Sequence, residues 1–425
     1  MLGKLKAILP DTAVLRRGHD FRMLFLSGVV SLLGSMTTMV ALPFQVAHLT
    51  GSFVSVGLLG LFELVPLVVF GLWGGALADA MDRRQLILLT EIAQAGLSGL
   101  LLINAALPHP AVWPIFGVAM LFAAADGLQR PSLDAIVPRL VSGPDLPGAI
   151  ALGSLKWQLG AIVGPSLGGL LIATAGPASA YAFDLLTFLV SALILVRINP
   201  VPPVASAEQP SWRTIAAGLH YARTRRDLLG TYLVDLAAMV FAYPTSLFPF
   251  LAIELHAPWS LGLLYAATSV GSLIATATSG WSRRTHHYGR AVVVAAFCWG
   301  IAIAGVGLVH SVLPTLLFLV AAGAADMVSG LFRGLIWNRS IPDDMRGRLA
   351  GVELLSYSVG PQLGQVRASG MASLTSLRTS IALGGIACAF SCVALAFSLP
   401  TLWAFDERTD ENVRRNATQD GAIEQ

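Results

Sequence analysis

Apolar segments of about 20 residues recur along almost the whole of the 425-residue chain. A helix needs roughly 20 apolar residues to cross the hydrocarbon core of a bilayer, so each segment predicts one membrane-spanning helix. Only 12% of the residues are charged, whereas a soluble domain has about 25%. This composition excludes an ordinary soluble enzyme, a nucleic-acid-binding protein and a disordered chain. We therefore expect an all-α integral membrane protein with twelve transmembrane helices. The predicted spans are 22–47, 54–78, 86–106, 111–130, 148–173, 178–198, 228–252, 260–282, 291–309, 312–334, 349–374 and 377–400.

The connections between the predicted spans are short except after the sixth, where a segment rich in proline and charge follows. We expect an N-terminal six-helix half at 1–198, a cytoplasmic linker at 199–227, a C-terminal six-helix half at 228–400 and a cytoplasmic tail at 401–425. Within the linker, Trp212, Ile215 and Leu219 recur at helical spacing among basic residues. This spacing predicts an amphipathic helix that lies on the membrane surface. The tail is polar from Asp406 onward, and we expect it to be disordered.

The basic residues predict which side of the membrane each loop faces. If the N-terminus is cytoplasmic, all of the 27 Lys and Arg residues except Lys156, Arg367 and Arg378 lie on the cytoplasmic side or at its helix ends. The positive-inside rule describes this distribution, so both termini are expected in the cytoplasm. Arginine greatly outnumbers lysine, which is typical of GC-rich bacterial coding. The expected location is the inner (plasma) membrane of a bacterium, where the lipid bilayer surrounds a multi-pass chain that has no nucleic-acid partner.

The two halves contain matching short patterns in the same order. Ala125-Asp126 in the fourth span matches Ala325-Asp326 in the tenth, and Gly164-Pro165-x-x-Gly168 in the fifth matches Gly360-Pro361-x-x-Gly364 in the eleventh. Both matches are offset by about 200 residues, which indicates a duplicated six-helix unit. Duplicated halves related by a pseudo-two-fold axis along the membrane normal, with a substrate site between them, are a known plan for transporters.

No sequence pattern predicts enzyme chemistry or a bound metal. The chain has no phosphate-binding glycine loop ending in Lys-Ser/Thr, which argues against an ATP-driven pump, and no His-Glu-x-x-His pattern. Cys298, Cys388 and Cys392 lie in apolar runs without disulfide or metal spacing. We expect no catalytic residue, no cofactor and no metal, and we expect the protein to work as a monomer.

The loop after the second span combines a glycine, two acids and a basic pair: Gly75, Asp79, Asp82, Arg83 and Arg84. The glycine permits two helices to approach closely, and the charges place an acid and a basic pair at the inner membrane surface. The alternative is an ordinary positive-inside loop with one acid at a helix end. The spacing of these residues resembles the conserved loop of the major facilitator superfamily.

This resemblance implies a twelve-helix transporter that works by alternating access. In the superfamily, an acid at the end of the fourth helix joins the loop acid and arginine in a charge relay, which implies an inner gate of Asp126, Asp79 and Arg83. The corresponding loop of the second half has His286 where the acid would be.

The fifth span contains glycines at intervals of four residues and an internal proline: Gly160, Gly164, Pro165, Gly168 and Gly169. Such glycines form a flat stripe that permits close helix packing, and the proline frees a carbonyl and permits a bend. Generic glycine packing is the alternative. The pattern resembles the antiporter signature of drug and proton exchangers in the superfamily, which favours export.

The segment from Leu263 to Ala267, the stretch from Thr278 to Gly280 and the turn Arg346-Gly347-Arg348-Leu349 are similar to bacterial siderophore exporters of the enterobactin-exporter type. These exporters grade into multidrug pumps. The favoured hypothesis is a proton-driven exporter of a bulky amphipathic small molecule, a siderophore or a drug, whose partners are that substrate and protons. The alternatives are a facilitator or importer of a small metabolite, and a membrane sensor or scaffold of the same fold.

Ionisable residues inside the spans are candidates for function, because a charge at bilayer depth costs roughly 2.5–3.5 kcal/mol on insertion scales. The candidates are Glu63, Asp126, Lys156, Asp184, Asp235, Asp326, Glu353 and Arg367. Asp126, Asp326 and Glu353 lie near helix ends, where pairing with the basic loops is expected. For Asp184, on the sixth span, we expect a local partner.

Three further expectations concern coupling. Asp235 lies on the seventh helix, which lines the cavity in the resembling fold, and is a candidate proton or substrate site. Lys156 and Asp326 lie at similar depth and are a candidate pair at the inner gate. Glu63 and Arg367 also lie at matching depth, at 1.5 Å rise per residue, and are a candidate pair at the outer gate. In each pair the alternative is a local partner for one or both residues.

Overall fold

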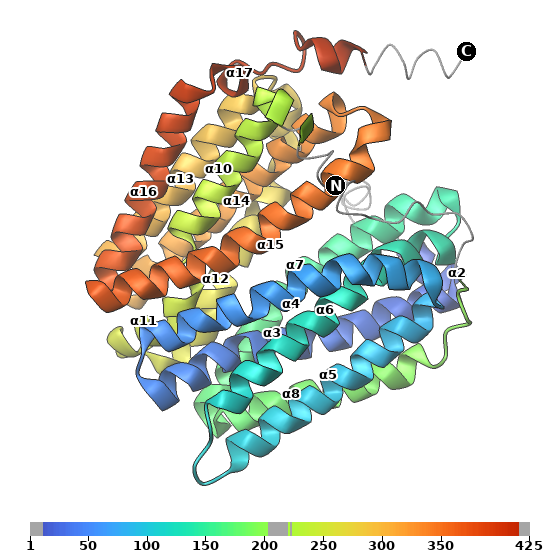
Figure 1. Ribbon diagram of the computed structural model, residues 1–425, viewed down its shortest axis with the longest axis vertical. Coiled ribbons are helices and arrows are strands. Elements are labelled where there is room, and N and C mark those ends of the chain that lie inside the picture. The colour runs from blue at the N-terminus through green and yellow to red at the C-terminus, as the bar shows by residue number, and fades with distance from the viewer. Residues whose placement is uncertain (1–11, 203–219, 222, 416–425) are drawn as a thin grey trace, which may run out of the picture. The chain divides into compact units, whose positions relative to one another are not determined.

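The computed structural model describes residues 12–202, 220–221 and 223–415. Only the backbone is described for Leu72, Gly75, Ala76, Ala78, Asp79, Arg283 and residues 343–357. The described part of the chain is helical apart from its turns and contains no strand (Figure 1). Each of the twelve predicted spans is helical, so the expected all-α class is confirmed. The predicted amphipathic helix of the linker falls largely on residues outside the described ranges.

The first half of the chain contains seven described α-helices. They are α2 (Ala13–Arg17), α3 (His19–Thr50), α4 (Phe53–Ala80), α5 (Arg83–Ala106), α6 (Trp113–Leu140), α7 (Leu146–Ala175) and α8 (Pro177–Leu195), with the short 3₁₀ helix η1 (Gly143–Asp145) before α7.

The second half contains the remaining elements. They are α10 (Arg226–Ala242), η2 (Thr245–Leu247), α11 (Phe248–Glu254), η3 (Pro258–Ser260), α12 (Leu261–Ala277), η4 (Ser279–Arg284), α13 (Tyr288–Leu308), α14 (Val312–Ser340), α15 (Asp343–Leu374), α16 (Leu377–Ser398) and α17 (Pro400–Trp403). Within the described residues, ten helical segments are long and apolar enough to cross a membrane. The other two long helices are α6, with 28 residues, and α15, with 32 residues.

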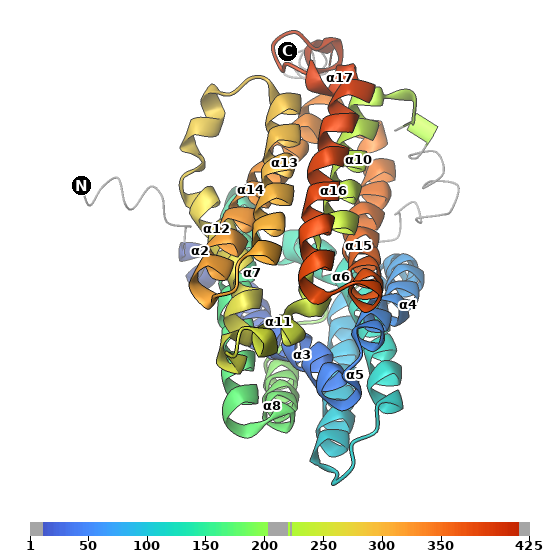
Figure 2. The ribbon, with the colours of Figure 1, turned by 90° about the vertical axis from the view of Figure 1, so that its left-hand side faces the viewer.

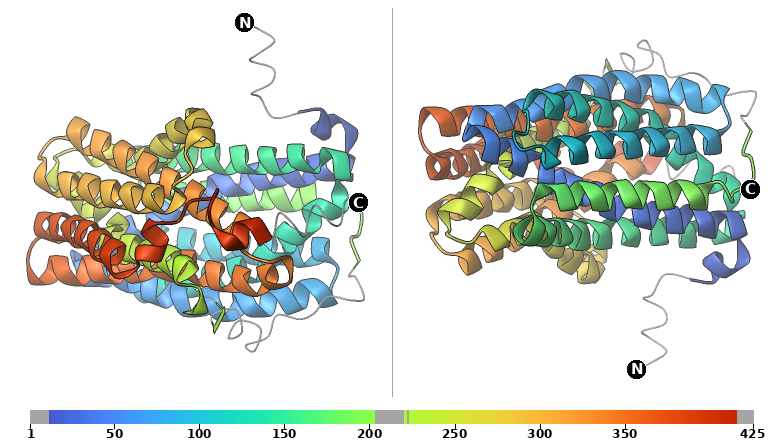
Figure 3. Two further views of the ribbon diagram at one scale, coloured as in Figure 1. Left: turned by 90° about the horizontal axis from the view of Figure 1, so that it is seen from above. Right: turned by 90° about the horizontal axis from the view of Figure 1, so that it is seen from below.

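The chain forms two compact units. Unit 1 comprises residues 1–51, 62–210 and 261–266, and unit 2 comprises residues 52–61, 211–260 and 267–425. In unit 1, α8 packs against both α3 and α5, and α7 packs against α3 (Figure 3). In unit 2, α13 packs against α14 and α16, and α10 packs against α15 and α16 (Figure 2).

Local sequence explains where several helices begin and end. Gly51 has φ of 60° and ends α3, and Gly176 has φ of 78° between α7 and α8. Glycine adopts this left-handed region at little steric cost, which permits the tight reversals there. At the start of α16, the side chain of Ser376 accepts a hydrogen bond from the Thr379 amide and satisfies one free donor of the first turn.

Two predicted spans differ from the structure. The seventh, predicted as one helix over 228–252, is interrupted at Tyr243 and Pro244, between α10 and η2. Proline lacks the amide hydrogen that would continue the helix. The eighth, predicted over 260–282, leaves the α-helical conformation after Ala277 and continues as η4.

The tail also differs from the expectation of disorder. Residues up to 415 are described, and Phe405 and Asp406 are buried, with 4% and 8% of their surface exposed. The sequence reading missed this because the polar residues that suggested a disordered tail find charged partners in unit 2, as described below.

Candidate functional site

The loop between α4 and α5 connects three helices of unit 1. Asp82 caps α5, because its carboxylate accepts a hydrogen bond from the Gln85 amide at 3.1 Å. Arg84 donates to the carbonyl oxygens of Leu195, at 3.1 Å, and Val196, at 2.7 Å, at the end of α8. A cation at a helix C-terminus satisfies its free carbonyls and complements the helix dipole.

Arg83 is buried and donates from Nη1 to the carbonyl oxygen of Ala135 on α6 at 3.0 Å. Asp126 forms its ion pair with Arg130, one turn along the same helix, at 3.6 Å. Nothing beyond the backbone is described for Gly75 and Asp79, which lie near the end of α4. The relay of Asp126, Asp79 and Arg83 therefore stays a prediction.

The glycines of α7 permit a close approach to α3. A Cβ atom at Gly168 would lie 2.9 Å from the Cα of Thr37, so a larger residue requires a shift of the backbone. Through Pro165 the helix continues without interruption. The other glycines and the neighbours that a Cβ would meet are Gly160 with Leu32, Gly164 with Met36, and Gly169 with Gly262 at the start of α12.

The matching glycines of α15 make the same kind of contact in unit 2. A Cβ at Gly360 would lie 2.8 Å from the Cβ of Met239, and a Cβ at Gly364 would lie 3.0 Å from the Cβ of Tyr243 and still closer to the Met239 carbonyl. The duplicated glycine-proline pattern therefore performs the same packing role in both units.

Unit 2 contains a cluster of three charged residues. Asp235 on α10 and Arg333 on α14 form an ion pair in which only 6% and 12% of the two side chains are exposed. Asp326, two turns before Arg333 on α14, interacts electrostatically with both of these residues and with Tyr243 at the helix interruption. The candidate residues Asp235 and Asp326 are thus brought together around Arg333, which the sequence reading did not include among the intramembrane charges.

Arg367 on α15 donates hydrogen bonds to backbone carbonyls at the interruption of the seventh span. Its Nε donates to the Val240 carbonyl at 3.2 Å, its Nη2 to the Phe241 carbonyl and its Nη1 to the Ser380 carbonyl at 3.1 Å. The first two carbonyls lie at the end of α10, where the helix leaves them without an amide partner. Nearby, Ser369 donates to the hydroxyl of Ser246 in η2 at 2.9 Å.

The remaining coupling candidates lie on different helices. Glu63 is half-buried on α4, and its pairing with Arg367 stays a prediction. Lys156 is half-buried on α7, and a Cβ at Gly28 would lie 2.7 Å from its ammonium nitrogen. Lys156 interacts electrostatically with Glu91 on α5. Its pairing with Asp326 also stays a prediction.

The sequence reading did not include Glu91 among its candidates, although the rule applied to the other acids would have found it. Glu91 lies eight residues into α5, has 4% of its surface exposed and accepts a hydrogen bond from Gln129 on α6 at 3.2 Å. Asp184, for which a local partner was expected, is fully buried and accepts hydrogen bonds from Thr38 on α3 at 2.6 Å and Ser98 on α5 at 2.7 Å.

The tail supplies acids to the loop of unit 2 in which His286 replaces the expected acid. Glu407 accepts a hydrogen bond from His286 Nδ1 at 2.6 Å and further contacts from Tyr288 and Arg339. Asp406 lies 3.1 Å from His287 and is hydrogen-bonded by Arg408, and these donors lower the pKa of the Asp406 carboxyl to about 2. No local sequence pattern signals this contact, because its members lie about 120 residues apart.

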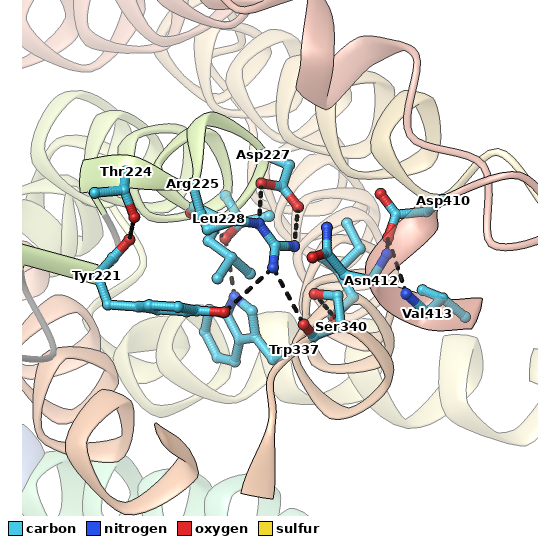
Figure 4. A network of polar contacts seen from close by, with 12 residues as sticks. Tyr221, Thr224, Arg225, Asp227, Leu228, Trp337, Ser340, Asp410, Asn412 and Val413 are labelled. Carbon is cyan, nitrogen blue, oxygen red and sulfur yellow. Dashed lines mark hydrogen bonds and ion pairs between the residues drawn. The ribbon is translucent and has the colours of Figure 1, made fainter. Parts of the chain in front are cut away.

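A second polar network lies where α10 begins (Figure 4). Arg225 donates to both carboxylate oxygens of Asp227, at 2.9 and 2.5 Å, and to the Tyr221 hydroxyl and Ser340 carbonyl, each at 3.3 Å. Burial disfavours the charged guanidinium, but the bonds to Asp227 outweigh it and raise the pKa of Arg225. Asp227 also lines a pocket of about 280 Å³ together with Asp406 and Asp410 of the tail.

Sequence similarity extends along nearly the whole chain. The sequence model of the transmembrane secretion effector family matches residues 12–419. The chain belongs to that family. It is therefore a multi-pass membrane protein and a secondary transporter of the major facilitator superfamily, not an enzyme.

Two curated relatives of this transporter are enterobactin exporters. EntS of Citrobacter koseri is 27% identical over 379 residues, which cover 89% of this chain and 91% of the relative. EntS of Shigella boydii serotype 18 is 27% identical over 399 residues, which cover 93% of this chain and 96% of the relative. The expected resemblance to this group of exporters is confirmed, at a distance that leaves the substrate open.

Solved structures match the fold at lower identity. A POT family transporter in complex with 5-aminolevulinic acid superimposes with a TM-score of 0.73 at 12% identity, over 91% of this chain and 97% of the other. The nucleoside transporter NupG superimposes with a TM-score of 0.69 at 12% identity, over 91% of this chain and 99% of the other. These likenesses confirm the major facilitator fold that the loop after the second span predicted.

Proposed function

We propose that this transporter exports a bulky amphipathic small molecule, a siderophore or a drug, in exchange for protons and by alternating access. The similarity to enterobactin exporters over about nine-tenths of the chain supports a siderophore as the first substrate to test. The glycine-proline pattern of α7, which resembles that of antiporters in the superfamily, supports export over uptake. The expected setting is the bacterial inner membrane with both termini in the cytoplasm.

The observation that carries this proposal is the cluster of Asp235, Arg333 and Asp326 beside the interrupted seventh span. Ionisable residues at membrane depth mark ion and substrate pathways. Interrupted helices supply free carbonyls and helix ends at which secondary transporters bind ions and substrates. Because two acids share one arginine, the binding of a proton changes which acid pairs with the arginine. When a proton neutralises one of the two acids, Arg333 pairs with the other, so one proton changes the pairing within unit 2.

Three further parts of the proposal rest on residues whose mutual contacts are predictions. They are the inner-gate relay of Asp79, Arg83 and Asp126, the inner pair Lys156–Asp326 and the outer pair Glu63–Arg367. Alternating access requires each of these contacts to form when its side of the protein is closed and to break when that side opens.

The experiment is transport into inside-out membrane vesicles from a bacterial host without its own siderophore exporters. The probes are a catecholate siderophore, a hydroxamate siderophore and a cationic dye. An imposed proton gradient should drive uptake of at least one probe, and a protonophore should abolish it. Removing ATP while the gradient is maintained should leave it unchanged. Asp235→Asn should lose gradient-driven uptake, and Glu411→Gln, an exposed acid of the tail, serves as the matched control.

Other outcomes would reject parts of the proposal. Uptake that needs ATP and ignores the gradient would rule out proton-driven export. Equilibration of a small metabolite without any response to the gradient would favour the facilitator hypothesis. An Asp235→Asn variant that retains full gradient-driven uptake would remove the charge cluster from the coupling mechanism.

A further inference from the structure

Three neighbouring helices of unit 1 share a buried polar stripe, which we call the polar column. Its members recur at intervals of three or four residues, or seven on α3, so on each helix they lie on one face. They are Ser31 and Thr38 on α3, Glu91, Gln94 and Ser98 on α5, and Asp184, Thr187 and Ser191 on α8. Each has less than a tenth of its surface exposed. No charge alternation in the sequence signals the column, because most of its members are hydroxyl residues.

Polar side chains lie along the column between its two carboxyls. At one end, Ser98 and Thr38 donate to Asp184. At the other end, Ser191 and Ser31 lie near the Glu91 carboxyl, but Ser191 makes no hydrogen bond of ordinary geometry with it. Seven residues separate Glu91 from Ser98, and seven separate Asp184 from Ser191. The carboxyls are therefore about 10 Å apart along antiparallel helices, at 1.5 Å rise per residue.

Several oxygen atoms in the column have no hydrogen-bond partner of ordinary geometry among the described residues. They are Glu91 Oε2, Gln94 Oε1, Asp184 Oδ1 and Ser191 Oγ, and all four are fully covered. A buried polar atom without a partner is unfavourable and therefore rare in proteins, so the concentration of such atoms here calls for an explanation. A proton on the carboxyl, or a water between the carboxyls and the amide, would satisfy these oxygens.

The surroundings of the two carboxyls contain few charges. Lys156 on α7 acts electrostatically on Glu91, and Glu91 acts on Asp184. Gln129 contributes a neutral amide from α6. The phenol of Tyr181, one turn before Asp184, donates to Gln45 on α3 at 2.7 Å and extends the polar contacts beyond the column.

We propose that the polar column carries protons through unit 1, with Glu91 and Asp184 as the two groups that bind and release them. The hydroxyls and the Gln94 amide both donate and accept, so they can pass a proton between carboxyls that are too far apart to exchange it directly. Asp184 accepts from hydroxyls and Glu91 from an amide, and among the described residues no arginine lies within hydrogen-bond distance of either carboxyl. Lys156 is the cation that acts on Glu91, and its charge favours the ionised form of that carboxyl. This proposal rests on the proton coupling proposed above and assigns part of it to unit 1.

Gly34 gives an independent way to close the column. A Cβ at this position would lie 2.6 Å from Asp184 Oδ1, the oxygen without a donor, and would also strike the Thr187 hydroxyl. Gly34→Ala therefore fills the space beside Asp184 without changing any charge. If the carboxyl variants fail to fold, this substitution still tests the same path.

The experiment uses the purified full-length transporter and requires no substrate. Infrared spectroscopy follows the carbonyl band of protonated carboxyls as the pH is raised. In a second measurement, proteoliposomes that contain a pH-sensitive dye report proton entry driven by a potassium diffusion potential. In the wild type, bands from buried carboxyls should titrate. Glu91→Gln and Asp184→Asn should each remove one band and most of the proton flux. Gly34→Ala should reduce the flux and shift the Asp184 band, whereas Asp145→Asn, a loop acid paired with Arg17, should change neither.

Each remaining result has a defined meaning. Titration bands identical to the wild type in Glu91→Gln and Asp184→Asn would overturn the polar column. A band that responds to sodium at constant pH would also overturn it and indicate a cation site. If the two carboxyl variants lose their bands but substrate transport by the wild type does not respond to the proton gradient, the polar column is supported and only proton-driven export is rejected.

Discussion

Unit 1 and unit 2 have the same glycine contacts but hold their buried acids differently. In unit 1, Asp184 accepts hydrogen bonds from two hydroxyls on neighbouring helices. In unit 2, Asp235 is bound by Arg333. A hydroxyl can hydrogen-bond a carboxyl in either protonation state, whereas an arginine pairs with the charged form. This difference is the basis of the two proposals above, in which unit 1 moves protons and unit 2 converts proton binding into a change of charge pairing.

The helix that meets the glycine stripe in each unit shows a second difference. In unit 1, α3 continues through Pro43, seven residues after Met36, whereas in unit 2 the helix stops at Tyr243 and Pro244, soon after Met239. Arg367, three residues after Gly364, binds the carbonyls that this stop leaves free. The position three residues after Gly168 in unit 1 is Leu171, which has no donor to offer. We therefore expect the interruption to depend on an arginine from another helix as well as on proline.

The largest expected effect is that of Arg333→Gln. This substitution leaves Asp235 as a buried acid without its cation, and breaking a buried pair in this way costs roughly 3–5 kcal/mol. We expect a large loss of thermal stability in detergent and loss of gradient-driven transport. The double variant Arg333→Gln with Asp235→Asn should recover part of the stability, because it removes both charges of the ion pair and leaves only Asp326 of the cluster charged.

The matched change in unit 1 sharpens this prediction. Asp184→Asn retains a side chain that Thr38 and Ser98 can still hydrogen-bond, so its cost in stability should be about 1 kcal/mol or less. Equal losses of stability in Arg333→Gln and Asp184→Asn would show that the two units do not hold their acids in different ways.

Arg367→Gln should have the next largest effect. It removes donors from the Val240 and Phe241 carbonyls, and hydrogen bonds to charged groups contribute about 1.5–3 kcal/mol each. We expect lower thermal stability and faster hydrogen exchange confined to residues around the interruption. Leu171→Gln at the corresponding position of unit 1 is the control. Hydrogen exchange at 240–247 that is unchanged in Arg367→Gln would show that the arginine does not hold the interruption.

The sequence predicted the spanning helices and the superfamily better than it predicted the contacts between helices. Twelve spans and the superfamily followed from apolar length and from the loop at 75–84, because membrane insertion depends on residues adjacent in sequence. The interruption at Tyr243 was missed because Pro244 alone does not predict it, since α3 continues through Pro43, and the Arg367 side chain that binds the carbonyls there lies more than 120 residues away. Glu91 lies inside the predicted third span and could have been found by the rule applied to the other acids. Arg333 was missed for a different reason: it lies at the end of the predicted tenth span, and only the helix face that it occupies shows that it is buried.

The glycine stripes should respond alike in the two units. Gly168→Ala and Gly364→Ala both place a methyl group against backbone atoms of the facing helix, and overpacking of this kind costs about 1–3 kcal/mol. Gly153→Ala on α7 and Gly370→Ala on α15 are matched controls, since a Cβ at either position meets nothing within 4 Å. We expect lower melting temperatures for the first pair only. A loss in one unit without the other would break the correspondence between α7 and α15.

The smallest expected effect concerns the loop acids. In unit 1 the acids are Asp79, near the end of α4, and Asp82, which caps α5, whereas in unit 2 the acid beside His286 is Glu407, contributed by the tail. Glu407→Gln should weaken the attachment of the tail to the loop at His286, because Arg339 and His286 lose their charged partner. Arg339 is half-exposed, and exposed pairs contribute about 0–1 kcal/mol, so global stability should change little while proteolysis of the tail becomes faster. High salt should have a similar effect on the wild type by screening the same charges.

Glu411→Gln, an exposed acid four residues further along, should leave the tail as resistant to proteolysis as in the wild type. If Glu407→Gln and Glu411→Gln are cleaved at the same rate, the tail does not supply the acid that the loop of unit 2 lacks.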